Sequence, residues 1–151
     1  MALFEMTHFA GWGDMDFNAH MRNTAYLDKS GDARMMFFAD RGYSMEKFYS
    51  LGMGPVVMKD VLEYYREVGL LGQFSITLRL AGLTPDGGIF VLVNDFTLPD
   101  GRAAARVKST GGWLDLAKRR FTRPPPELLE IMESLEKTAD FTRSPALPVR
   151  P

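Results

Sequence analysis

The chain of 151 residues contains no cysteine. That absence excludes disulfide bonds, thiolate metal sites and a cysteine nucleophile. Only two histidines are present, His8 and His20, and a zinc site built on several histidines is therefore not expected. We expect no metal and no redox cofactor.

An excess of charge is also lacking. The formal net charge is -1, which provides no long-range field for nucleic acid, and no polybasic block marks a membrane surface. Residues 1–10 carry Glu5 and His8 and no apolar run, unlike a signal peptide or a membrane anchor. We therefore expect a cytoplasmic protein that binds neither nucleic acid nor membranes.

What is present is typical of a single globular domain. Hydrophobic residues make up 46% and charged residues 25% of the chain, which is an ordinary balance. A chain of this length buries a sizeable core without disulfides or metals. We expect one domain over residues 1–137 and a loose tail over residues 138–151, which holds three prolines.

The first part of the chain predicts a strand followed by a long helix. Residues 3–12 are mostly apolar with aromatic character, which favours a strand. The polar segment 13–23 interrupts this pattern with residues that tolerate turns. Over residues 24–41, apolar side chains recur at helical spacing. Asn23 or Thr24 is the expected N-cap.

Small residues in the middle of this helix predict its surroundings. Ser30, Gly31 and Ala33 let other segments approach the helix backbone closely, as a sheet curled around the helix would. Gly42 is suited to end the helix. A short helical turn is expected over residues 45–49.

The second part predicts an antiparallel meander and a final helix. Apolar runs separated by glycine-rich and proline-rich turns predict strands over residues 56–68, 74–80, 89–98 and 103–116. Gly111-Gly112 is expected to mark a bulge. A helix beginning at Pro124-Pro125-Pro126 carries an apolar stripe, formed by Leu128, Ile131, Met132 and Leu135. Helices and strands are segregated, which indicates an α+β fold.

The segment 13–23 is the best candidate for chemistry. It carries two carboxylates, Asp14 and Asp16, together with His20 and two asparagines. The helix start that follows presents unpaired N–H groups and about half a positive charge, which suits an anion, including one formed in a transition state. Ionised aspartate can attack a carbonyl or draw a proton from water. The Gly-x-Ser-x-Gly motif of a serine nucleophile is absent.

The same segment resembles a known family. A resemblance to the 4-hydroxybenzoyl-CoA thioesterase-like branch of the hotdog superfamily covers about residues 4–116 and is carried by Asp14-Met15-Asp16, His20, Asn23, Tyr26-Leu27, Arg34 and Tyr65-Arg66-Glu67-Val68. It implies a hotdog fold, in which a curved antiparallel sheet wraps one long central helix, here with an added C-terminal helix. It also implies homodimers or homotetramers, with the active site between two subunits.

The resemblance further implies hydrolysis of an acyl-CoA or acyl-carrier-protein thioester, with coenzyme A present only as part of the substrate. The catalytic carboxylate falls on Asp16, as nucleophile or general base, and the oxyanion donor falls on the backbone N–H of Asn23 or its neighbour. His20 is expected to hydrogen-bond the substrate carbonyl or to hold the loop. Asn18 and Tyr26 are the expected substrate contacts.

The segment departs from the family pattern at two positions. Ala19 stands where many relatives have glycine, and Arg22 stands where many have asparagine. We expect Ala19 to stiffen the loop.

Simpler roles are expected for several other residues. Asp14 is expected to be structural, and Arg66 and Glu67 to form an exposed ion pair of small effect. The cluster Met35, Met36, Phe37 and Phe38 suits the core or a dimer interface, with an acyl pocket as the alternative. Candidate contacts for the phosphates of coenzyme A are Arg79, Arg102, Arg106 and Lys108.

Two other functions remain open. A hotdog hydratase or dehydratase divides proton transfer between a histidine and a carboxylate, roles that His20 and Asp16 could take. A hotdog domain can also act as a non-catalytic acyl-thioester sensor. Thiol release, enoyl-thioester hydration and binding without turnover would separate the three functions.

Overall fold

The computed structural model describes residues 3–151. Seven strands are present in this range: β1 (Phe4–Phe9), β2 (Met53–Tyr64), β3 (Gln73–Leu83), β4 (Ile89–Thr97), β5 (Ala103–Asp115), β6 (Arg120–Thr122) and β7 (Lys137–Thr142). The helices are α1 (Asn23–Asp40), α2 (Met45–Ser50) and α3 (Pro126–Glu133), and one 3₁₀ turn spans Trp12–Asp14. Within the described range, no helix has the length and apolar character needed to cross a membrane.

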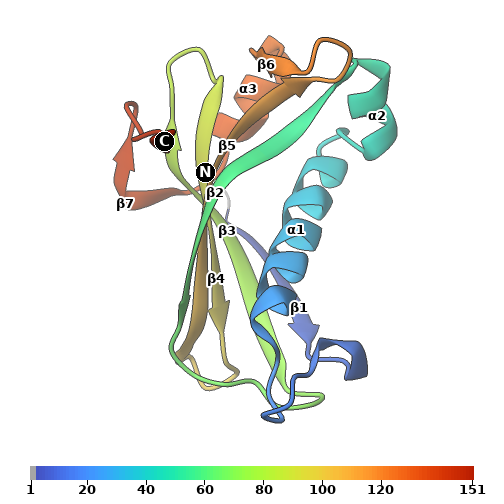
Figure 1. Ribbon diagram of the computed structural model, residues 1–151, viewed down its shortest axis with the longest axis vertical. Helices are drawn as coiled ribbons and strands as arrows, with labels where there is room; N and C mark the ends of the chain where they lie inside the picture. The colour runs from blue at the N-terminus through green and yellow to red at the C-terminus, as the bar shows by residue number, and fades with distance from the viewer. Residues whose placement is uncertain (1–2) are drawn as a thin grey trace.

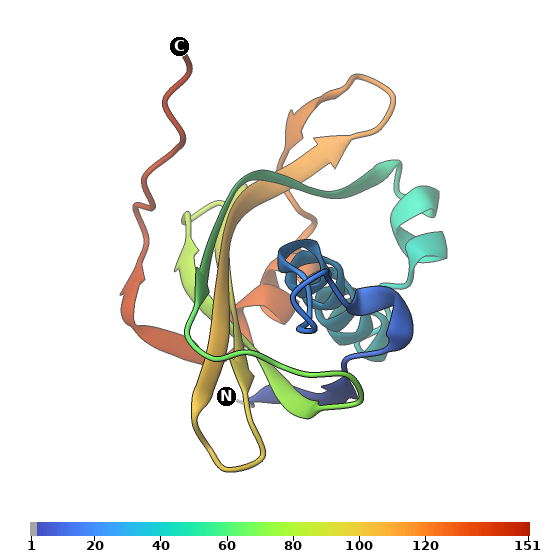
Figure 2. The same cartoon turned by 60° about the horizontal axis from the view of Figure 1, so that its bottom comes forward.

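One curved sheet wraps the long helix α1, as Figures 1 and 2 show. The strand order is β1-β3-β4-β5-β2, and neighbours in this order are antiparallel. The short strand β6 pairs with β5, and β7 runs parallel to β3. This confirms the α+β class and the arrangement that the resemblance implied.

The buried face of α1 follows the predicted stripe. Tyr26, Ala33 and Phe37 are all buried, and their side chains face β3, β4 and β5 across the concave side of the sheet. The Tyr26 ring lies edge-on to Phe96 of β4, with 5.1 Å between ring centroids. Apolar burial of this kind is the main stabilising contribution to a fold of this size.

A polar contact also ties α1 to the sheet. Arg34 donates from Nε to Asn94 Oδ1 at 2.9 Å and from Nη2 to Ser109 Oγ at 2.6 Å. Ser109 Oγ in turn donates to Asp60 of β2. Burial lowers the pKa of Arg34 to about 10, and the nearby Asp60 carboxylate opposes that shift. The contact links one helix to three strands.

The bulge expected at Gly111-Gly112 lies on the partner strand instead. Val57 pairs with Gly111 and Lys59 with Thr110, so Met58 is the extra residue and belongs to β2. Gly111 is required for a different reason, because a Cβ there would overlap the carbonyl oxygen of Val56 and the Phe90 ring. The glycine therefore allows close approach rather than causing the irregularity.

The ends of two elements also differ from expectation. The N-cap of α1 is Arg22 rather than Asn23 or Thr24, because the Arg22 N–H donates to Asp14 O at 2.8 Å and holds the chain extended there. The segment expected to be a loose tail contains β7, whose Lys137 pairs with Leu80 of β3. Strand pairing satisfies backbone groups at the part of the β3 edge that β1 leaves uncovered.

Candidate active site

The loop between β1 and α1 is held in place by Asp14. Its Oδ2 accepts a hydrogen bond from the Gly11 N–H at 2.7 Å and an ion-pair contact from Lys29 Nζ at 2.9 Å. The Lys29 side chain is only 7% exposed. Burial raises the pKa of Asp14, but the hydrogen bonds from Lys29 and Gly11 outweigh it and leave the pKa below its ordinary value. Asp14 is thus a structural anchor, as expected.

Arg22 fastens the same loop from its other end. Its guanidinium donates to the carbonyl oxygen of Gly13 and, from Nε, to Thr24 Oγ1 at 2.9 Å. The side chain that replaces the asparagine of many relatives therefore closes the loop onto the first turn of α1.

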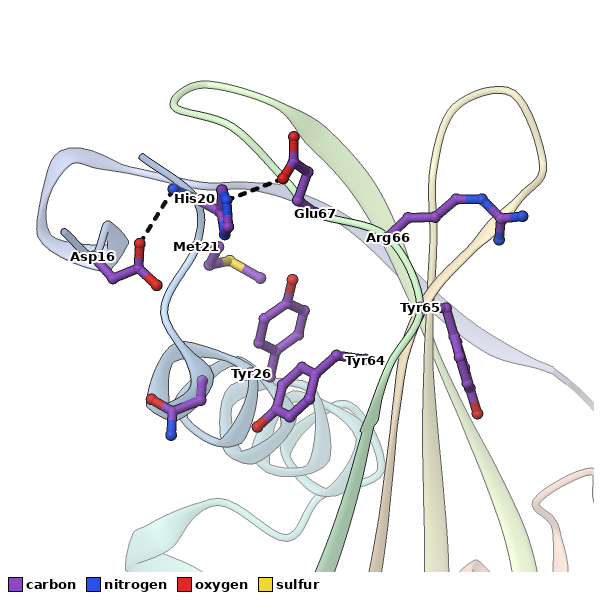
Figure 3. A pocket seen from close by; sticks show the side chains of 9 residues that line it. Asp16, His20, Met21, Tyr26, Tyr64, Tyr65, Arg66 and Glu67 are labelled. Carbon is purple, nitrogen blue, oxygen red and sulfur yellow. Dashed lines mark hydrogen bonds and ion pairs between the residues drawn. The ribbon is translucent and has the colours of Figure 1, made fainter. Parts of the chain in front are cut away.

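Asp16 sits at the tip of this loop with one oxygen held and the other available. Oδ1 accepts the backbone N–H of Asn18 at 2.8 Å and that of His20 at 3.3 Å. Figure 3 shows the other carboxylate oxygen turned toward the cleft that Asp16 lines. Residues 3–151 contain no ion-pair partner for this carboxylate. The geometry leaves a negative oxygen in a fixed and accessible position.

The loop reaches this shape through an unusual backbone conformation at Ala19. Its φ is 64°, in the left-handed region that glycine adopts with less strain. A glycine would adopt this conformation freely, and Ala19 adopts it with some strain. Strain of this kind is common near functional sites.

Asn23 is the first residue of α1 and lines the same cleft. Backbone N–H groups in the first turn of a helix have no intrahelical partner, and the N-terminus carries partial positive charge. The start of α1 and Asp16 therefore line one cleft.

His20 contacts Glu67, a residue that was expected to pair with Arg66. Its Nε2 lies 3.0 Å from Oε2 of Glu67, as Figure 3 shows. Arg66 instead donates to the carbonyl oxygen of Ala103 at 2.9 Å, so the expected Arg66–Glu67 pair is wrong. Both residues follow the end of β2 at Tyr64 and line the cleft, but they make separate contacts.

Tyrosines form the inner wall of the cleft. Tyr26 and Tyr64 meet edge-to-face with 5.4 Å between ring centroids, and both line the cleft. Burial raises the pKa of Tyr26, and the nearby Tyr64 and Asp16 add to this. The cleft encloses about 330 Å³, within the range of about 300–1,000 Å³ for small-molecule sites.

The structure brings together four of the five expected site residues. Asp16, His20, Asn23 and Tyr26 all line the cleft, whereas Asn18 does not and contributes its backbone N–H to Asp16. From the sequence, no site role was assigned to five other residues that line the cleft: Met21, Tyr64, Tyr65, Arg66 and Glu67. The sequence did indicate a role for Glu67, because this residue belongs to the Tyr65–Val68 segment that carries part of the family resemblance. For Met21 and Tyr64, no sequence pattern indicated a place in the site.

The expected phosphate contacts lie elsewhere. None of the four candidate basic residues lines the cleft. Arg79 and Arg106 pair with Asp95, at 3.5 Å and 2.7 Å, and Arg102 pairs with Asp100 at 2.7 Å. Arg66 is the arginine that lines the cleft. Within residues 3–151 no group of acidic residues and histidines has the arrangement of a metal site.

Comparisons with known proteins identify the family and the fold of this chain. A family profile described as the thioesterase-like superfamily matches residues 10–132. A hypothetical protein from Staphylococcus aureus, solved in complex with CoA, has a TM-score of 0.82 at 20% identity, covering 97% of this chain and 96% of its own.

Two further structures show the same likeness. A 1,4-dihydroxy-2-naphthoyl-CoA thioesterase from Synechocystis has a TM-score of 0.78 at 12% identity, covering 89% of this chain and 98% of its own. A probable thioesterase from Escherichia coli, YbaW, has a TM-score of 0.71 at 23% identity, covering 89% and 99%. At these identities the structures establish the fold, and the profile match establishes the family. The chain belongs to the thioesterase-like superfamily and has its hotdog fold.

Proposed function

We propose that this protein hydrolyses acyl-CoA thioesters to the free acid and the thiol. The observation that carries the proposal is the position of Asp16. One of its oxygens is held by two backbone N–H groups, and the other faces a cleft that also contains the start of α1. Family membership and the CoA complex of the similar staphylococcal protein support this substrate class.

In this proposal, Asp16 and the start of α1 act on the two atoms of the thioester carbonyl. The carboxylate attacks the carbonyl carbon, or removes a proton from the water that does so. The N–H of Asn23 or its neighbour donates to the oxygen as negative charge develops there, which lowers the barrier. The carbon–sulfur bond then breaks, and the thiolate leaves and takes up a proton. On the general-base route the attacking water has already supplied the oxygen of the free acid, and on the nucleophilic route a water molecule then hydrolyses the acyl–Asp16 anhydride to release the acid.

The remaining residues of the cleft position the substrate. His20, held by Glu67 at 3.0 Å, would keep the loop against the end of β2 and place its ring beside the carbonyl. Tyr26 and Tyr64 would flank the pantetheine arm, and Arg66 at the rim would contact the phosphates of the nucleotide. A second copy would complete the cleft, as the resemblance implies.

Replacing Asp16 with asparagine tests the proposal. The amide Oδ1 can still accept from Asn18 and His20, so the loop should keep its shape while the charge is lost. We expect Asp16→Asn to fold normally by circular dichroism and to lose at least about a hundredfold in kcat, the scale typical of a catalytic acid–base group. The assay follows thiol release with a thiol-reactive dye, and the protein adds no background because it has no cysteine.

Asp32→Asn is the matched control. Asp32 is exposed on α1 and does not line the cleft, so this variant removes one charge without touching the site and should keep normal turnover. Full activity in Asp16→Asn, across short, long, branched and aromatic acyl groups, would refute the role of Asp16. Tight binding without thiol release in the unaltered protein would point to a sensor.

A further inference from the structure

A second concavity lies on the other side of Asp16. It is a groove of about 500 Å³, lined by Trp12, Met15, Asp16, Phe17, Ala19 and Leu70. Asp16 is the one residue that lines both this groove and the tyrosine-walled cleft. Asp16 therefore lies between the two concavities, and their lining side chains differ: tyrosines and charged groups on one side, mostly apolar side chains on the other.

The walls of this groove are large apolar groups that water surrounds. The Phe17 side chain is fully exposed and Trp12 is 84% exposed, with Leu70 and Leu71 also exposed beside them. Exposed apolar surface gathered in one place is unfavourable in water, and such patches mark surfaces that bind a ligand, another chain or a membrane. An apolar ligand that covers this patch would remove its surface from water, which is favourable.

The backbone holds these walls in a defined position. The Ala10 N–H donates to Gly72 O at 3.0 Å, and the Leu71 N–H donates to Ala10 O at 2.7 Å. Met21 donates to Val68 O at 2.7 Å. These bonds join the segment before Trp12 and the end of the Asp16 loop to the 68–72 turn, so the groove is built from two paired segments.

We propose that this groove binds the hydrocarbon chain of the substrate, and that the protein therefore prefers unsubstituted aliphatic acyl groups. The inference rests on the proposed function, because it places the thioester carbonyl at Asp16. The acyl chain then extends past Phe17 and Trp12, and the thiol arm lies in the tyrosine cleft. Apart from Asp16, the indole N–H of Trp12 is the only N–H or O–H side-chain group of the lining, so the groove offers few specific partners to a polar substituent and would bind mainly by covering apolar surface.

Chain length is the first quantity that tests this assignment. Each methylene removed from water contributes about 0.8 kcal/mol, which is about a fourfold change in kcat/KM while the chain still fills the groove. We expect kcat/KM to rise from acetyl-CoA to decanoyl-CoA. Phe17→Ser should lose at least about tenfold on decanoyl-CoA, the effect of partly losing one large apolar contact, and the loss should become smaller as the acyl chain shortens toward acetyl-CoA.

Tyr49→Ser is the matched control, because Tyr49 is an exposed aromatic residue on α2 that lines neither concavity. It should leave the whole length series unchanged. An equal loss on all acyl lengths in Phe17→Ser, or a change in its oligomeric mass by light scattering, would overturn the proposal. The patch would then pack against a second copy of the chain.

Tryptophan fluorescence separates failure of this inference from failure of the proposed function. Trp113 is fully buried, whereas Trp12 is exposed in the groove, so a chain covering Trp12 shifts the emission to shorter wavelength. We expect decanoate to cause this shift, acetate to cause none, and Trp12→Phe to abolish it. A shift without any thioester hydrolysis would retain the groove and reject the proposed function. Hydrolysis of decanoyl-CoA without a shift would reject the groove.

Discussion

At the scale of single residues, the carboxylates of Asp14 and Asp16 differ in burial and in the groups that they contact. Asp14 is only partly exposed and contacts Lys29 at 2.9 Å, whereas Asp16 is exposed and contacts backbone N–H groups of its own loop. A carboxylate engaged by a buried ammonium group has little freedom to react. One that is oriented only by backbone amides keeps an oxygen for the substrate.

The Asp14–Lys29 pair is expected to stabilise the fold. Asp14→Asn should lower the free energy of unfolding by about 3 kcal/mol, because it leaves the buried Lys29 without its carboxylate. Adding Lys29→Met should recover most of this loss, since a methionine of similar length needs no partner. Urea denaturation of both variants measures the effect. Turnover of Asp14→Asn should fall much less than that of Asp16→Asn, and equal losses would mean that the catalytic carboxylate was misassigned.

The same pair has a predictable pH dependence. The pKa of Asp14 is lowered in the folded protein, so its stabilisation is complete above the unfolded aspartate pKa of about 3.9 and is lost as the pH falls through the lower folded-state pKa. The stability difference between the unaltered protein and Asp14→Asn should therefore shrink below about pH 4. A difference that stays constant into acid would contradict the role of the charge.

At the scale of secondary-structure elements, the antiparallel pairing of β2 with β5 depends on one glycine, Gly111. A Cβ at position 111 would overlap Val56 and Phe90, so Gly111→Ala should lower the free energy of unfolding by about 1–3 kcal/mol, the usual cost of overpacking. Gly54→Ala is the control, because Gly54 lies in β2 with nothing within 4 Å of an added Cβ. Thermal denaturation should leave this control near the stability of the unaltered protein. Similar losses in both variants would indicate a general intolerance of alanine in these strands.

The main elements were predictable from local patterns, and each exception has its own cause. The long helix begins within one residue of the predicted start, and the four long strands lie close to their predicted ranges. An element that buries one face has apolar residues at a regular spacing, and this spacing is visible in the sequence. The short strands β6 and β7 were not predicted. Three residues in β6 are too few to show a period, and β7 depends on the uncovered edge of β3.

At the scale of the whole molecule, strand β2 is a free edge of the sheet. It is last in the strand order and carries exposed Val57, Val61 and Tyr64. A long strand with unpaired backbone groups and apolar side chains is prone to pair with another chain. Two copies joined there would extend the sheet, and Tyr64 would bring the cleft next to the interface.

We therefore expect this protein to be at least a dimer in solution. Light scattering should give a mass of two or four times the 17.0 kDa of one chain. A mass of a single chain at the concentrations used for the thioester assay would contradict the proposal that two subunits form each cleft. A dilution series in the same instrument distinguishes a stable assembly from a transient one.

The sequence alone determined which reactive side chains the protein has and which segment is the candidate for chemistry. The absence of cysteine, the Asp14–Asn23 segment and the helical stripe through Tyr26 and Phe37 are visible without coordinates, because they are local in the chain. Only the tertiary structure decided which groups meet: Lys29 with Asp14, His20 with Glu67, and Asp16 between a polar cleft and an apolar groove. Contacts between distant segments depend on how the sheet curves around the helix, which no local pattern records.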